Sequence, residues 1–173
     1  MLSALHAEFQ KAHRRHDLAI CLVVPVVVFL WTGRLTSNDP EELANAYSAL
    51  LYALPVLNAI LMPVVMALLA SRLWDIEVKG STTKLLYTLQ SRRSLFAAKA
   101  AFGIGEVVLM VALEMGAAVL LGRTQHYTEA LPVGQLFYLG GCTLAVDVML
   151  YLSELLLMLA WENPLPALCV SIV

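Results

Sequence analysis

Four apolar segments, each close to the length of a bilayer crossing, follow one another along this chain of 173 residues. Hydrophobic residues make up 60% of the sequence and charged residues only 14%, whereas a soluble domain is about half apolar and about a quarter charged. A transmembrane helix needs about 20 mostly apolar residues, because the hydrocarbon core is about 30 Å thick. The sequence therefore predicts an all-α integral membrane protein, a polytopic helix bundle forming a single domain. The predicted spans cover residues 18–33, 46–73, 95–121 and 134–160.

Polar and helix-breaking residues interrupt the second predicted span. Pro55 and Pro63 flank Asn58 there. Proline leaves backbone groups without their helical partners, and these must be satisfied by neighbouring helices or by a water-lined cavity. Asn58 is therefore either a hydrogen-bonding contact between helices or part of a polar pathway. In the third span, small residues recur every four positions, as at Ala101 and Gly105, which favours close helix packing.

Basic residues gather on one side of these spans. Residues 1–16 have apolar positions at helical spacing among basic ones, which predicts an amphipathic helix on the inner membrane surface. Residues 74–94 form a basic loop between the second and third spans. Because cytoplasmic loops are enriched in Lys and Arg, we expect a cytoplasmic N-terminus and loop. The basic residues assigned to the inside are Lys11, Arg14, Arg15, Arg72, Lys79, Lys84, Arg92, Arg93 and Lys99, against Arg34 and Arg123 outside.

Within the basic loop, Ser81 can cap a short helix in which three leucines share one face. These are Leu85, Leu86 and Leu89. An apolar face on a polar cytoplasmic loop is typical of a docking surface for a partner protein.

Four acidic residues fall inside the last two predicted spans: Glu106, Glu114, Asp147 and Glu154. A charge at mid-bilayer costs at least about 2.5 kcal/mol on insertion scales, so each carboxyl needs protonation, a partner or water. With Lys99 counted in the loop, we expect no basic residue within the spans to pair with them. They are either hydrogen-bonded between helices or part of a pathway for a cationic or amphipathic substrate. The predicted pathway residues are Asn58, Glu106, Asp147 and Glu154.

The chain lacks the sequence patterns of an enzyme. It has no Gly-rich phosphate loop and no Ser/His/Asp grouping, and its three cysteines fit no metal-ligand or disulfide pattern. We therefore expect no catalytic activity, no bound cofactor or metal, and no nucleic-acid partner.

The central loop resembles that of the ABC type-2 transporter permeases. The similarity lies in the acidic turn and Gly of residues 75–80, the Leu-Leu pair within 84–88, the Ser-Arg pair at 91–92 and the following Lys99. Residues 7–11 before a proline-bearing first span also resemble that family. The chain is most similar to the permeases of lantibiotic (bacteriocin) immunity transporters, although Leu89-Gln90 stands where Pro-Val is usual.

This resemblance implies a six-span permease with an N-terminal elbow helix at 1–16 and a coupling helix at about 81–90. The coupling helix would dock a cytoplasmic ABC ATPase, which would bind ATP and Mg for the complex. A second copy or a homologous permease would complete the assembly in a bacterial plasma membrane. By the same pattern the chain is incomplete at its C-terminus, with residues 167–173 starting a fifth span. The implied docking residues are Lys84, Leu85, Leu86 and Arg92.

Three functions fit these features. The first is the membrane subunit of an ATP-driven exporter that moves an amphipathic peptide or hydrophobic drug out of the membrane, with self-immunity as one role. The second is a proton-coupled carrier that uses the intramembrane acids, although carriers usually show repeated halves. The third is a membrane scaffold or sensor subunit that transports nothing.

Overall fold

The computed structural model describes residues 17–35, 40–79 and 92–161, and these residues form helices joined by short connections, with no strand among them. The expected all-α membrane bundle is confirmed. The elbow helix at 1–16, the coupling helix at 81–90 and the segment 167–173 lie outside the described residues. The helices are α2 (Asp17–Leu35), α3 (Pro40–Leu43), α4 (Ala46–Lys79), α6 (Arg92–Thr124) and α7 (Val133–Trp161).

Three of these helices contain an apolar stretch long enough to cross a bilayer: Ala46–Leu73, Ser94–Thr124 and Val133–Met158. The apolar part of α2 is shorter, Ala19–Arg34. At a rise of about 1.5 Å per residue, its 19 residues extend about 28 Å, just under the thickness of the hydrocarbon core. Helices α4 and α6 are much longer, about 50 Å, so both continue beyond that thickness. Helix α4 ends at Lys79 and α6 begins at Arg92, so both helices extend into the predicted loop of 74–94.

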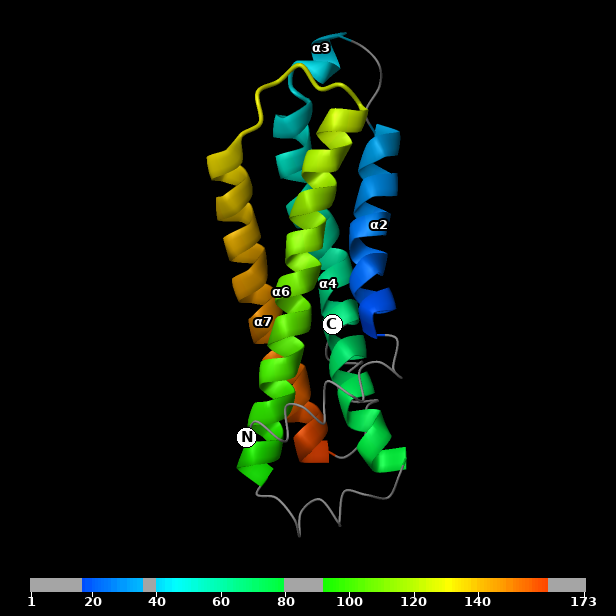
Figure 1. Cartoon of the computed structure of the whole chain (residues 1–173), viewed down its shortest axis with the longest axis vertical. Helices are drawn as coiled ribbons and strands as arrows, with labels where there is room; N and C mark the ends of the chain where they lie inside the picture. Colours follow the sequence, from blue (N-terminus) through cyan, green and yellow to red (C-terminus); the bar gives the residue numbers. More distant parts are fainter. Residues whose placement is uncertain (1–16, 36–39, 80–91, 162–173) are drawn as a thin grey trace.

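The helices alternate in direction along the chain (Figure 1). The short helix α3 and the connection between α6 and α7 lie at one end of the bundle, and Lys79, Arg92 and Trp161 lie at the other. The most extensive contacts join α4 to α7 and α2 to α6, followed by those between α6 and α7. Each of the two largest interfaces therefore pairs helices that run in the same direction and are not consecutive in the sequence.

Apolar side chains fill the bundle and also cover its outer surface. The core includes Leu54, Met66 and Met110, each with no exposed surface. Large apolar side chains face outward at four-residue intervals along α4, as expected of a helix surrounded by lipid. These outward residues are Tyr52, Val56, Ile60, Val64 and Leu68.

Two glycines of α6 receive tyrosine side chains from neighbouring helices. A Cβ at Gly103 would overlap the phenol of Tyr151 from α7, and a Cβ at Gly122 would overlap the phenol of Tyr47 from α4. The small residues at Ala101 and Gly105 are exposed instead, and nothing lies within 4 Å of a Cβ built at Gly105. The close approaches of α6 therefore occur at glycines outside the regular four-residue repeat.

Lys99 is buried inside the bundle, with 1% of its surface exposed. Its Nζ donates a hydrogen bond of 2.6 Å to the carbonyl oxygen of Leu73, and its own carbonyl accepts one of 3.0 Å from the Tyr151 hydroxyl. The expectation that the spans hold no basic residue is wrong, because Lys99 lies within α6 and packs against α4. The spans therefore do contain a basic residue.

A carboxylate fastens the connection between α6 and α7 onto the start of α4. The Glu129 carboxylate accepts hydrogen bonds from the Ser48 amide (3.0 Å) and the Ser48 hydroxyl (2.6 Å). The first amides of a helix have no partner within the helix, so Glu129 satisfies one of them from a distant part of the chain. Tyr127 adds an edge-to-face contact with Tyr47, with ring centroids 5.0 Å apart. The Ser48 hydrogen bonds lower the pKa of the Glu129 carboxyl below its ordinary value of 4.5.

Replacing Gly103 or Gly122 with alanine will destabilise the bundle by about 1–3 kcal/mol, because the added methyl group overlaps a packed tyrosine. Thermal unfolding in detergent measures this change. Gly105→Ala is the matched control, since open space surrounds that position. Equal melting temperatures for all three variants would contradict the packing described here.

The contribution of Glu129 to stability will depend on pH. A lowered pKa in the folded protein means that the stabilisation is present above the ordinary value of 4.5 and is lost as the pH falls through the folded value. Glu129→Gln will therefore have a lower melting temperature than the wild type at pH 7. The difference in melting temperature between the two proteins will become smaller in acid. Glu41→Gln is the control, because Glu41 is an exposed acid on α3. A difference in melting temperature between Glu129→Gln and the wild type that does not change with pH would refute the prediction.

Candidate functional site

Three polar side chains from three helices are buried at a similar depth in the bundle. Asn58 of α4 is 6% exposed, Glu114 of α6 is fully buried, and Asp147 of α7 is 1% exposed. Counted from the helix ends near α3, they lie 12, 10 and 14 residues into their helices, which is about 15–21 Å at 1.5 Å per residue. This depth corresponds to the middle of a bilayer.

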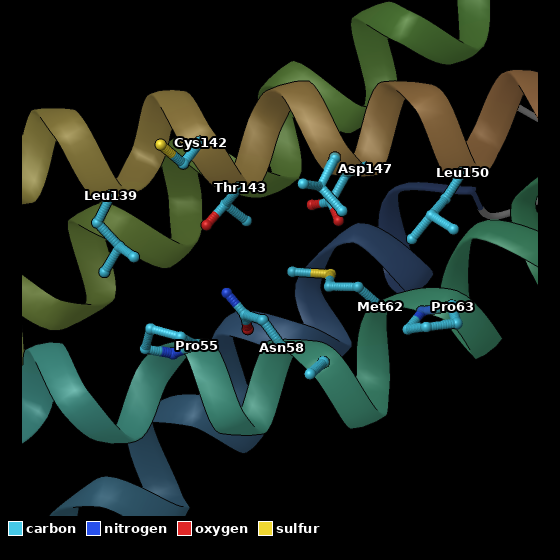
Figure 2. A pocket seen from close by; sticks show the side chains of 11 residues that line it. Pro55, Asn58, Met62, Pro63, Leu139, Cys142, Thr143, Asp147 and Leu150 are labelled. Carbon is cyan, nitrogen blue, oxygen red and sulfur yellow. The ribbon is translucent and has the colours of Figure 1, made fainter.

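A cavity of about 340 Å³ lies between α4 and α7 next to these residues. Figure 2 shows the Asn58 amide pointing into it from α4, and the Thr143 hydroxyl and Asp147 carboxyl pointing into it from α7. The other lining residues are Pro55, Ala59, Met62, Pro63, Leu139, Cys142, Val146 and Leu150. The cavity thus combines a polar centre with mostly apolar walls.

The cavity opens sideways, towards the outer surface of α4 and α7. Pro55 and Ala59 on α4, and Cys142 and Val146 on α7, are all exposed while they line it. Asn58 and Asp147 lie behind them and are buried. A molecule dissolved in the surrounding lipid therefore meets an apolar entrance before it reaches the polar groups.

Most of the polar atoms here have no hydrogen-bond partner within the described residues. This holds for both amide atoms of Asn58, both carboxyl oxygens of Glu114 and Oδ2 of Asp147. The Asn58 amide nevertheless approaches the Glu114 carboxyl closely enough to act on it as a hydrogen-bond partner, and Asp147 is close enough to act on it electrostatically. A buried polar group without a partner costs about 1–3 kcal/mol, so this cluster opposes folding unless something binds to it.

The remaining two predicted pathway acids lie apart from the cavity. Glu106 and Glu154 are buried, 8% and 3% exposed, but neither lines it. The backbone carbonyl of Glu106 accepts a hydrogen bond from the Cys21 thiol of α2 at 3.8 Å, so this residue sits on the side of α6 that faces α2. The structure thus brings Asn58 and Asp147 together at the cavity. Glu114, which the predicted pathway set omitted, does not line the cavity either, but unlike Glu106 and Glu154 it neighbours Asn58 and Asp147. Its similar depth to the other two was the available sequence signal.

The predicted docking residues mostly fall outside the described part of the chain. Lys84, Leu85 and Leu86 are not among the described residues, and Arg92 begins α6 without a described side chain. Their role stays a prediction. Across residues 17–35, 40–79 and 92–161, no group of three His, Cys, Asp or Glu residues could hold a metal ion.

A second cavity, of about 550 Å³, lies between α6 and α7 and is lined only by apolar residues and glycines. Ala112 and Gly116 of α6 and Gly141 of α7 form part of it. It offers no polar group to a ligand, which distinguishes it from the cavity at Asp147.

The family model for ABC-2 family transporter proteins matches residues 4–173 of this chain. The chain belongs to the ABC-2 transporter family. It is a membrane permease of an ABC transporter, a transport subunit of a kind that generally lacks an ATPase site of its own. No curated protein and no solved structure matched the chain.

Replacing Asn58 with leucine, a residue of similar size, will leave the melting temperature of this ABC-2 permease unchanged or raise it. The amide makes no hydrogen bond of good geometry among the described residues, and only the Glu114 carboxyl approaches it. An apolar side chain removes the desolvation cost of the amide. Leu54→Ala on the same helix will lower the melting temperature, because Leu54 is fully buried in the core. A loss of stability in Asn58→Leu comparable to that control would show that Asn58 holds the helices together.

Proposed function

We propose that this permease is the membrane-spanning subunit of an ATP-driven exporter, which moves an amphipathic peptide of the lantibiotic or bacteriocin type, or a hydrophobic drug, out of the membrane. The main support for this proposal is the match of residues 4–173 to the ABC-2 transporter family model. Self-immunity of a producing bacterium is the physiological role that this substrate class favours.

The cavity between α4 and α7 supports an amphipathic substrate. Its entrance is apolar and faces the lipid, and Asn58 and Asp147 lie behind it. A substrate that partitions into the bilayer would reach this cavity sideways without crossing water. We place the substrate pathway here, and leave Glu106 and Glu154 out of it because they do not line the cavity.

Coupling to ATP hydrolysis follows from how the helices are joined. The segment 80–91 follows α4 and precedes α6 in the chain, and these helices carry Asn58 and Glu114. A partner that moves this segment would act on both at once, because stiff helices transmit rigid-body motion. We propose that a cytoplasmic ABC ATPase, which binds the ATP and Mg, docks on Lys84, Leu85, Leu86 and Arg92. A second copy or a homologous permease completes the transporter in the bacterial plasma membrane, with the N-terminus of this chain in the cytoplasm.

Replacing Leu85 and Leu86 together with aspartate will abolish association with the ATPase and leave the chain in the membrane. The charges remove the apolar face that we assign to docking. Affinity purification of the tagged chain from gently solubilised native membranes, followed by mass identification of accompanying subunits, measures the effect.

Tyr52→Asn serves as the control, because this side chain is 81% exposed at the other end of α4. An unchanged yield of ATPase with the double variant would refute the docking assignment. Recovery of the wild-type chain without any nucleotide-binding subunit would refute the exporter itself.

A further inference from the structure

We propose that Asn58, Glu114 and Asp147 bind the positively charged amine of an amphipathic substrate, which enters from the lipid between α4 and α7. The proposal rests on the proposed function for its physiological meaning, and it adds the chemical group that the site recognises. Its experiment needs neither ATP nor an ATPase, so its failure would leave the exporter assignment standing.

The cluster has the oxygen ligands that a cationic group requires. Asp147 supplies a carboxyl group at the cavity, and the Asn58 amide and Thr143 hydroxyl supply further oxygens. Glu114 does not line the cavity, but it neighbours Asn58 and Asp147 and supplies a second carboxyl group directly behind them. None of the eleven residues that line the cavity is basic. An ion pair is much stronger in a low-dielectric interior than in water, so an amine bound here would be held firmly.

A backbone carbonyl freed by a proline is one more hydrogen-bond acceptor at the wall of the cavity. Pro63 has no N–H, so the carbonyl of Ala59, four residues earlier, lacks its helical donor. Ala59 itself lines the cavity. Its carbonyl is therefore available to a donor such as an ammonium group.

The apolar walls identify the rest of the ligand. Met62, Leu139, Val146 and Leu150 surround the polar centre, which suits a hydrocarbon chain attached to the charge. A bare metal ion fits less well, because the described residues hold no group of three metal-ligating acids, histidines or cysteines. The volume of about 340 Å³ is near the lower limit of small-molecule sites. It suits one cationic side chain, while the body of a larger substrate stays in the lipid.

Three other buried polar side chains of this bundle are each hydrogen-bonded to a backbone carbonyl, as expected of a structural role. Thr32 donates to the Val28 carbonyl at 2.5 Å, Lys99 to the Leu73 carbonyl and Tyr151 to the Lys99 carbonyl. Apart from the approach of Asn58 to Glu114, the amide of Asn58 and the carboxyl of Glu114 have no such partner within the described residues, although both are more than nine-tenths buried. Oε2 of Glu154 also has no partner in the described part of the chain, but Asn58 and Asp147 in addition line a cavity. This combination assigns the cluster to a ligand.

The test is the equilibrium binding of radiolabelled octylammonium to the full-length chain, purified with its accompanying subunits into phosphatidylcholine nanodiscs. We expect saturable binding to the wild type. Asp147→Asn and Glu114→Gln will each weaken it at least about tenfold, because hydrogen bonds to charged groups contribute about 1.5–3 kcal/mol. Glu154→Gln is the matched control, a buried carboxyl on the same helix as Asp147 but off the cavity, and will bind as the wild type does.

A second variant tests the place of binding without altering charge. Cys142→Trp will fill the entrance, since Cys142 is exposed and lines the cavity, and will abolish binding. Ala112→Trp, in the apolar cavity between α6 and α7, will not. Both are compared only as folded, monodisperse protein with the melting temperature of the wild type within a few degrees.

Four results would overturn the proposal. These are the absence of saturable octylammonium binding to the wild type, equal competition by octanol, equal weakening by Glu154→Gln, and full binding by Cys142→Trp. Competition by octylammonium but not octanol, together with the losses in Asp147→Asn and Glu114→Gln, would establish a site for an amine.

Discussion

The cost of placing a polar group in hydrocarbon governs this structure. Helices satisfy the backbone, which is why every described element is a helix. Buried polar side chains must find partners as well, and Lys99 and Tyr151 do so at backbone carbonyls of neighbouring turns or helices. In the first half of α6 and in its last turn, respectively, Gly103 and Gly122 leave room for tyrosine rings from α7 and α4. These contacts fix α6 between its neighbours, so the helix presents Glu114 to the interior.

Against this background the group of Asn58, Glu114 and Asp147 stands out. Three helices each bring one unsatisfied polar side chain to the same depth, beside a cavity that opens towards lipid. A bundle selected for stability alone would carry apolar residues here, because isosteric apolar packing costs nothing in desolvation. We interpret the cluster as the part of this permease that is maintained for its substrate.

The connectivity links that cluster to the opposite end of the molecule. Helices α4 and α6 extend past the hydrocarbon thickness, and residues 80–91 join them. Asn58 and Glu114 lie on these two helices, whereas Asp147 lies on α7, which packs against both. A shift of α4 and α6 relative to α7 would change the spacing between the three side chains. A transporter needs such a change to alternate between holding and releasing a substrate.

The sequence by itself determined the class of fold, because apolar run length and the helix requirement in lipid are local properties. It also indicated Asn58 and Asp147, since polar residues in apolar runs are visible without a structure. Only the tertiary structure decided which of them meet. It showed that Asn58 and Asp147 line the cavity while Glu106 and Glu154 do not, that Glu114 neighbours Asn58 and Asp147, and that Lys99 is buried in the core. The rotation of each helix about its axis settles such questions, and that rotation depends on packing between helices distant in sequence.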